Sequence, residues 1–140
     1  MKKRNQKRQC GFSLIEMLMI LIILGLLGFL TGPKLFGTQG KAKQKTAKIQ
    51  VERLMMAVEA FRLDVGRYPT QQEGLTALVI NSGIEKWKGA YLKRALPNDP
   101  WGNPYKYRNP GVHGVVDIYS YGQDKQSGGT KENADIGSWE

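Results

Sequence analysis

A run of 19 residues, from Phe12 to Leu30, contains only apolar residues, glycine and serine, apart from one glutamate, Glu16. As an α-helix this run would be about 28 Å long, close to the roughly 30 Å thickness of a bilayer core. A carboxylate in such a segment is costly, so it is expected to be functional and to have a partner. On the helix alone, a glutamate that rests at the level of the lipid headgroups without a role is equally compatible with the sequence.

The segment before this run, residues 1–11, is basic and has no acidic residue, which keeps this end of the chain in the cytoplasm. No small-residue cleavage site follows the run, so we expect the helix at 12–31 to remain in the mature protein as a membrane span. The only cysteine is Cys10, which precedes the apolar run rather than following it as in a lipoprotein. With a single thiol the chain cannot form an intramolecular disulfide.

The rest of the chain, residues 32–140, predicts one small globular domain. Pro33 follows a glycine and is expected to kink or locally break the helix. An apolar stripe with spacings of three and four residues then predicts an amphipathic helix over 41–65, ended by Gly66. The stripe consists of Ala47, Val51, Leu54, Val58, Phe61 and Val65.

Residues 66–140 indicate short elements and many turns. Thr70 and Glu73 fit a capping box that begins a short helix through Leu75, Leu78 and Val79. A turn-rich stretch at 96–105 contains Trp101, which we expect to fold back as an anchor in the core. Two short strands are predicted, at 105–107 and 115–121, joined across 109–111. The expected fold class is α+β, with a long N-terminal helix packed on a small antiparallel sheet.

Charge and composition give no indication of nucleic-acid binding or catalysis. The net charge of +9 arises largely from five Lys and Arg residues in the leader, and the basic cluster at 34–48 has no interleaved aromatic residues. His113 is the only histidine and lies in a glycine-flanked turn, where we expect it to be exposed. Because no nucleophile–base pair, phosphate-binding glycine loop or zinc spacing is present, we do not expect an enzyme.

The C-terminal segment is acidic and rich in glycine. Oxygen-rich, glycine-rich loops suit calcium, which takes about six to eight oxygen ligands. The segment does not match the EF-hand pattern, and on composition alone a solvated polar loop is the better interpretation. Its acidic residues are Asp117, Asp124, Glu132, Asp135 and Glu140.

The start of the chain, with Gly11 before Phe12-Ser13-Leu14-Ile15-Glu16 and an apolar helix, resembles the class III signal of type IV pilins and type II secretion pseudopilins. The resemblance implies that a prepilin peptidase cleaves between Gly11 and Phe12 and N-methylates Phe12. It implies that Glu16 pairs with the amino terminus of Phe12 on a neighbouring subunit. It also implies that the helix near Pro33 unwinds on assembly.

Several motifs of the soluble part resemble the major pseudopilins in particular, so that the likeness runs from Gly11 to Trp139. Type IV pilins usually close their C-terminal region with a disulfide, which this chain cannot do. The motifs are Tyr68-Pro69-Thr70, Glu73-Gly74-Leu75, Leu96-Pro97, Asp99-Pro100-Trp101-Gly102, Pro104-Tyr105, Asp117-Ile118 with Ser120, and Ala134 to Trp139.

This resemblance implies a pilin-like fold and a structural role. The chain would be a homopolymer, growing as a periplasmic filament that drives export of folded proteins across the outer membrane. Its partners would be minor pseudopilins, the prepilin peptidase and, indirectly, the inner-membrane platform and a cytoplasmic ATPase. The protein would cross the inner membrane once, with its N-terminus in the cytoplasm and its C-terminal domain in the periplasm.

The resemblance also implies a structural calcium ion in the loop 121–136. By position, the carboxylates of Asp124 and Asp135 and the backbone carbonyls of Tyr121 and Gln126 would be its ligands. Some relatives carry a further acid where this chain has Ala134, so Glu132 or a water would complete the set. Asp117 lies upstream in a strand and is less suited to reach the ion.

Two other functions are compatible with the leader. A type IV pilus or competence subunit that binds DNA or surfaces would require an exposed basic patch or a C-terminal disulfide, and the sequence indicates neither. A minor pseudopilin at the filament tip could lack the glutamate at position 16 or carry larger insertions, whereas here Glu16 is present and the domain is compact.

Overall fold

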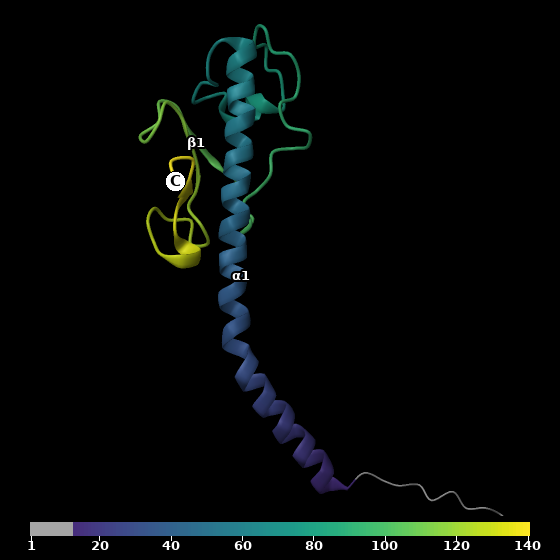
Figure 1. The fold of residues 1–140 in the computed structure, drawn as a ribbon. Coiled ribbons are helices and arrows are strands. Elements are labelled where there is room, and N and C mark those ends of the chain that lie inside the picture. Colours follow the sequence, from purple (N-terminus) through teal and green to yellow (C-terminus); the bar gives the residue numbers. More distant parts are fainter. Residues whose placement is uncertain (1–12) are drawn as a thin grey trace, which may run out of the picture. The chain divides into compact units, whose positions relative to one another are not determined.

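The computed structural model describes the backbone of residues 13–140 and the side chains of residues 13–27 and 39–140. The chain divides into two compact units, Met1–Gly37 and Thr38–Glu140. One helical element, α1 (Leu14–Val65), covers both parts of the expected N-terminal helix (Figure 1). The single long helix is therefore confirmed. The backbone of α1 is helical through Pro33, so a local break is not observed there.

In the N-terminal unit, α1 begins after Ser13, whose carbonyl accepts the backbone N–H groups of Glu16 and Met17 at 3.0 and 3.2 Å. The large apolar side chains between Leu14 and Leu27 are between 41 and 84% exposed. Taken over the described residues alone, the structure contains no helix that is both long and apolar enough to cross a membrane.

In the globular unit, the apolar stripe of α1 is buried as predicted. Ala47, Leu54, Val58 and Phe61 are fully buried in the core. Each large apolar side chain that leaves water in this way contributes about 1.5–3 kcal/mol. The helix ends at Val65, and the next residue, Gly66, has a φ of +86° that suits glycine and an N–H that donates to the Arg62 carbonyl at 2.8 Å.

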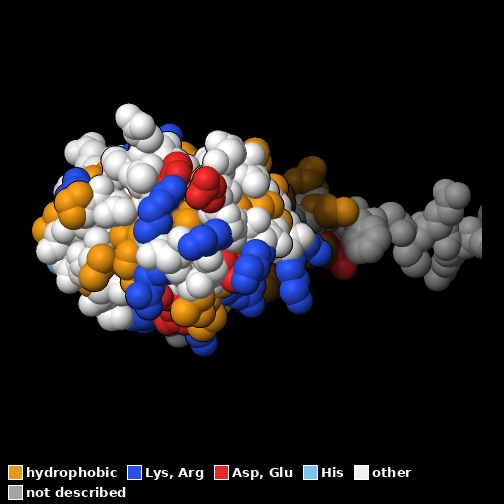
Figure 2. All heavy atoms as spheres, turned by 90° about the horizontal axis from the view of Figure 1, so that it is seen from above, with side chains coloured by type: hydrophobic (Ala, Val, Ile, Leu, Met, Phe, Trp, Pro, Cys, Tyr) orange, Lys and Arg blue, Asp and Glu red, His pale blue; other side chains and the backbone are white. Residues whose placement is uncertain are grey.

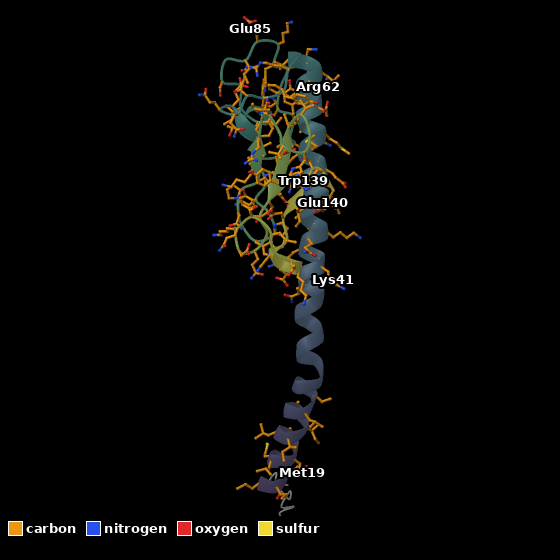
Figure 3. The ribbon with its side chains drawn as sticks, turned by 90° about the vertical axis from the view of Figure 1, so that its left-hand side faces the viewer. Met19, Lys41, Arg62, Glu85, Trp139 and Glu140 are labelled. Carbon is orange, nitrogen blue, oxygen red and sulfur yellow. The ribbon has the colours of Figure 1, made fainter. Side chains whose placement is uncertain are left out.

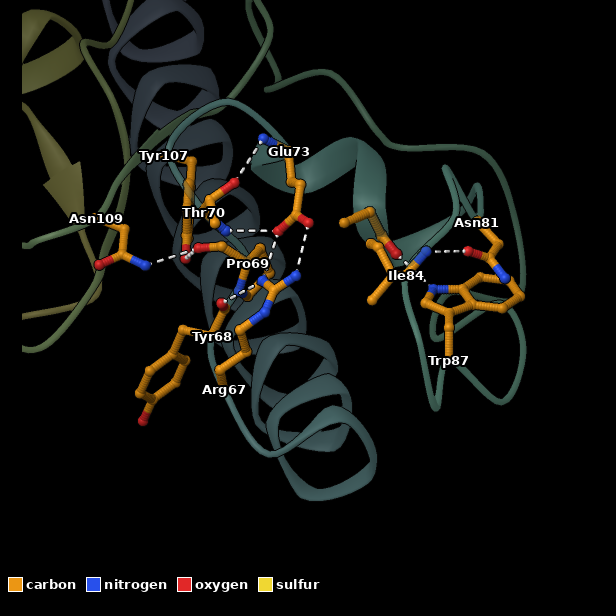
Figure 4. Close-up of polar contacts among 11 residues, drawn as sticks. Arg67, Tyr68, Pro69, Thr70, Glu73, Asn81, Ile84, Trp87, Tyr107 and Asn109 are labelled. Atoms are coloured by element: carbon orange, nitrogen blue, oxygen red, sulfur yellow. Dashed lines mark hydrogen bonds and ion pairs between the residues drawn. The ribbon is translucent and has the colours of Figure 1, made fainter.

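The turn after α1 is fixed by a reciprocal pair of hydrogen bonds between Thr70 and Glu73 (Figure 4). The Thr70 N–H donates to Glu73 Oε2 at 2.7 Å, and the Glu73 N–H donates to Thr70 Oγ1 at 3.2 Å. The predicted capping box is therefore confirmed. The helix that follows is a short 3-10 helix, η1 (Gly74–Leu78), which buries Leu75, Ala77 and Leu78.

The Arg67 guanidinium donates two hydrogen bonds to the Glu73 carboxylate, at 2.7 and 2.8 Å. The guanidinium, together with the backbone and hydroxyl of Thr70, lowers the pKa of Glu73 to about 2. Because this pKa lies below the value of about 4.3 in an unfolded chain, the stabilisation is complete above pH 4.3 and is lost as the pH falls towards 2.

We expect Glu73→Gln to lower the free energy of unfolding by roughly 1–2 kcal/mol at pH 7. This value is smaller than the full pKa shift of Glu73 would give, because Arg67 is half exposed and water screens the ion pair. Denaturant melts between pH 7 and pH 2 should show the difference from wild type shrinking with acid. Glu85→Gln is the control, since Glu85 is exposed and makes no ion pair within residues 39–140. A difference that stays constant with pH would contradict this account.

Three short strands form an antiparallel sheet in the order β1-β2-β3 beside α1 (Figure 1). They are β1 (Lys106–Arg108), β2 (Asp117–Ser120) and β3 (Ile136–Gly137). Tyr107 pairs with Ile118, and Ser120 pairs with Ile136. The two predicted strands are confirmed, the first shifted by one residue and the second shorter than predicted. The third was not predicted, because two residues are too few to show an alternating pattern.

The sheet and the turn-rich stretch both contribute to the core around α1. The Tyr107 hydroxyl donates to the Pro69 carbonyl at 2.8 Å, and burial raises its pKa to about 12. Trp87 Nε1 donates to the Ala77 carbonyl at 2.8 Å (Figure 4). Trp101 is partly buried and packs against the core, as predicted. The expected α+β architecture, a long helix packed on a small antiparallel sheet, is therefore confirmed.

Candidate functional site

The predicted assembly residues lie in and before the first part of α1. Glu16 is exposed in the first turn of the helix, where a carboxylate is favoured by the helix dipole, and its neighbours are exposed apolar side chains. The processing residues Gly11 and Phe12 lie outside the described residues. Pro33 lies within α1, and its side chain is also outside them.

The second candidate site is the loop at 121–136, which leaves the sheet at the end of β2 and returns to it at β3. Its two arms pass closely at Gly122, where a Cβ would lie 2.7 Å from the Glu132 carbonyl oxygen and 2.9 Å from that of Ala134. Gly122 also has a φ of +70°, so both its backbone and its surroundings require glycine. The Gln123 N–H donates to the Glu132 carbonyl at 2.9 Å and ties the arms together.

Asp135 is the best-placed metal ligand in this loop. Its Oδ2 accepts the Gly128 N–H at 2.9 Å and lies 3.5 Å from Ser127 Oγ. Its Oδ1 is buried and accepts no hydrogen bond. A buried, unpaired carboxylate oxygen is costly, and a cation is one of the few partners that would satisfy it.

The other predicted ligands lie in the first arm of the loop. Asp124 Oδ1 accepts the Gln126 N–H at 3.2 Å, and both residues are exposed. Tyr121 is half-buried, with its ring 5.1 Å from that of Tyr119. The structure records no hydrogen bond between Asp124 and Asp135. Among the described residues, no three His, Cys, Asp or Glu side chains converge on one point.

Glu132 does not point towards these ligands. Its carboxylate lies against Gly40 of α1, in the space that a side chain at position 40 would occupy. Beside it, Gln44 Nε2 donates to the Lys131 carbonyl in the short helix η2 (Lys131–Asn133). Glu132 therefore helps to dock the loop on α1, and the sequence alone gave no reason to expect this contact.

The donor set of the loop suits calcium. Two carboxylates, two backbone carbonyls and water are all hard oxygen ligands, and Ca²⁺ accepts irregular arrangements of about six to eight of them. The unpaired Asp135 Oδ1 is the observation of this structure that favours an ion. Calcium at this point would tie the two arms of the loop together without a disulfide.

At the opposite end of β2, Asp117 organises a different loop. Its buried carboxylate accepts the backbone N–H groups of Val112, His113 and Gly114, at 2.6 to 3.1 Å. Burial alone would raise the pKa of Asp117, but these hydrogen bonds outweigh it and hold the pKa below its ordinary value. The Asp117 carboxylate is therefore engaged at the end of β2 opposite to the loop 121–136.

His113 is exposed, as predicted, but it is not without contacts. Its ring stacks on Trp139 with centroids 3.9 Å apart, and its Nδ1 lies 3.4 Å from Asp117 Oδ2. Trp139 and Glu140 lie beside α1 (Figure 3), where Glu140 is 3.7 Å from Lys48 Nζ. These contacts hold the C-terminal residues of the chain on the globular unit.

Comparison with known proteins gives a consistent result along the whole chain. The family model of type II secretion system protein G matches residues 34–139, and that of the prokaryotic N-terminal methylation motif matches residues 6–31. Type II secretion system core protein G of Pseudomonas aeruginosa is 41% identical over 97% of this chain and 99% of its own length. The Vibrio cholerae protein of the same name is also 41% identical, over 97% of this chain and 95% of its own length.

A solved structure has the same fold. The crystal structure of the major pseudopilin from the type 2 secretion system of enterohaemorrhagic Escherichia coli superimposes with a TM-score of 0.64 at 35% sequence identity. The superposition covers 76% of this chain and 91% of that one.

Proposed function

The chain belongs to the family of type II secretion system protein G, and we propose that it is the major structural subunit of a periplasmic pseudopilus. In this role it polymerises into a filament that drives export of folded proteins across the outer membrane. The proposal rests on one observation: a processing motif, an apolar helix and a globular unit with the pseudopilin fold occur together in this chain.

The apolar first part of α1 supports assembly. Its large side chains are exposed from Leu14 to Leu27. Because contact of these side chains with water is unfavourable, we expect lipid or other copies of the chain to cover them. Identical subunits that join through a heterologous contact without closing generate a helical filament. We infer that this helix anchors the subunit in the inner membrane before assembly and lies in the filament core afterwards.

Processing creates the partner that Glu16 needs. Cleavage after Gly11 frees the amino group of Phe12, and N-methylation leaves that amine basic. A positive amine of one subunit paired with the carboxylate of Glu16 on the next would lower the cost of burying both charges. The pair would also set the axial register between subunits, and unwinding near Pro33 would let the helix adapt to the filament.

We further propose a structural calcium ion in the loop 121–136. Asp135 and Asp124 would supply carboxylate oxygens, and Tyr121 and Gln126 would supply backbone carbonyls. Calcium would compensate the unpaired Asp135 Oδ1 and hold the two arms of the loop together. Its role would be structural, as the role of the subunit is.

The expected partners follow from this role: further copies of the chain, minor pseudopilins, the prepilin peptidase and, indirectly, the inner-membrane platform and its cytoplasmic ATPase. The N-terminus would lie in the cytoplasm and the globular unit in the periplasm. Figure 2 shows the Lys and Arg side chains of one face, with acidic and apolar side chains among them.

The proposal is tested by expressing the chain in a bacterium whose own gene for protein G is deleted. Type II secretion requires correct contacts with the other components, so the host should be a species with a close relative. We expect secreted enzyme activity to return to the medium, and a chain with Gly11→Val to be unprocessed and inactive. Stable, processed protein that restores no secretion in several such hosts would contradict the proposed role.

A further inference from the structure

Two buried polar side chains outside the proposed ligand set meet at the base of the loop 121–136. Ser120 is 1% exposed and Asp99 is 5% exposed. The Ser120 hydroxyl donates to Asp99 Oδ2 at 2.6 Å. The other oxygen, Oδ1, accepts the backbone N–H groups of Asn103 at 2.7 Å and Trp101 at 3.1 Å. Asp99 therefore connects the turn 99–103 to the end of β2.

Ser120 occupies the point where both arms of the loop leave the sheet. It is the last residue of β2, and its strand partner is Ile136 in β3. The next residue after Ser120 is Tyr121, and the residue before Ile136 is Asp135. Two of the four proposed calcium ligands are thus direct neighbours of the Ser120–Ile136 pair, one on each arm.

The same hydroxyl also fixes the first corner of the loop. Ser120 Oγ accepts the Gly122 N–H at 3.1 Å, and Asn103 Nδ2 lies 3.4 Å from the Gly122 carbonyl oxygen. The peptide unit whose N–H is held by Ser120 is the one that carries the Tyr121 carbonyl. Orienting that N–H therefore orients the carbonyl that would bind the ion.

We propose that Asp99 and Ser120 are positioning residues for the calcium ion, so that the site extends beyond its loop to the turn 99–103. This inference rests on the proposed calcium site. Asp99 holds the Ser120 hydroxyl, the hydroxyl holds the Gly122 N–H, and the Tyr121 carbonyl is thereby aimed at the ion. Groups that orient metal ligands typically change metal affinity by about 10–100-fold when they are removed.

The experiment separates positioning from a general effect on stability. Processed full-length protein in detergent micelles is titrated with Ca²⁺, and the Kd is measured by calorimetry. Thermal unfolding is followed by tryptophan fluorescence, which reports on the globular unit because Trp87, Trp101 and Trp139 all lie there. Ser120→Ala removes the hydroxyl, and Asp99→Asn keeps an acceptor at position 99 but removes its charge.

We expect Ser120→Ala to raise the calcium Kd at least about 10-fold, with the calcium-dependent rise in Tm reduced accordingly. Ser138→Ala is the matched control, because Ser138 Oγ also accepts one backbone N–H from β2, that of Ile118 at 3.2 Å, but does not contact the loop. Its Kd should equal that of the wild type. Asn103→Ala, which removes only the weak contact to Gly122, provides a second variant if Ser120→Ala does not fold, and should weaken binding severalfold.

The outcomes distinguish the two proposals. If the wild type shows no calcium binding at millimolar concentrations, the calcium site itself is wrong and this inference falls with it. A second outcome is that the wild type binds calcium and the variants lower the Tm in chelator without changing the Kd. The variants in question are Asp99→Asn and either Ser120→Ala or, where that variant does not fold, Asn103→Ala. In that case the residues are merely structural and the positioning role is overturned.

Discussion

Replacing Phe61 with alanine should lower the free energy of unfolding of the globular unit by about 3–5 kcal/mol, the usual range for a buried phenylalanine. The side chain of Phe61 is fully buried, and its ring meets that of Tyr91 edge-on with centroids 5.6 Å apart. The substitution would remove this contact and leave a cavity between α1 and the segment that carries Tyr91. Denaturant unfolding, followed by tryptophan fluorescence, measures the change.

Leu63 provides a matched control on the same helix. It is 79% exposed, so Leu63→Ala should change the free energy of unfolding by no more than about 0.5 kcal/mol. Similar losses for the two variants would mean that the apolar stripe of α1 is not what holds the globular unit together.

Removing the Asp135 carboxylate should abolish the stabilisation by calcium. At a calcium concentration about 100-fold above the Kd, binding to the folded state adds about 2.7 kcal/mol. For a unit of this size that corresponds to a rise in Tm of about 10–20 °C. In Asp135→Ala we expect the Tm to be the same with calcium and with chelator, because the buried, unpaired Oδ1 is lost.

Glu132→Ala tests whether the effect depends on the position of the acid or only on the net charge of the loop. The Glu132 carboxylate lies against Gly40 of α1, so its loss should leave most of the calcium response intact. Asp124→Ala, by contrast, should behave like Asp135→Ala. A wild-type Tm that is unaffected by millimolar calcium would rule out the metal site and leave the assembly role to be judged on the helix alone.

The helical part of this fold could be predicted from sequence because it repeats a simple pattern over many residues. The stripe from Ala47 to Phe61 has the spacing of a helix face, and the structure buries it. The capping box at Thr70 was predictable for the same reason, since its two hydrogen bonds join residues close in sequence. Local rules were sufficient in both cases.

The contacts around the candidate site could not be predicted in this way, because they join residues far apart in the chain. Asp99 and Ser120 are 21 positions apart, and the strand partner of Ser120 lies in a two-residue strand too short to recognise. The composition of the loop alone favoured a solvated polar loop. The proposed ligands were identified only through the resemblance to a family. At Pro33 the sequence predicts a kink or a local break, and the backbone is helical through that position, so a local break is not observed there.

The central claim, that this chain polymerises through its N-terminal helix, is tested most directly by the yield of filaments sheared from cells that overproduce it with the secretion machinery. We expect filaments from the wild type and none from Glu16→Leu, although that variant should still insert in the membrane and fold. Glu52→Leu, on the globular part of α1, is the control and should retain assembly. Abundant filaments from Glu16→Leu, or processed and folded wild-type protein that forms none, would contradict the account.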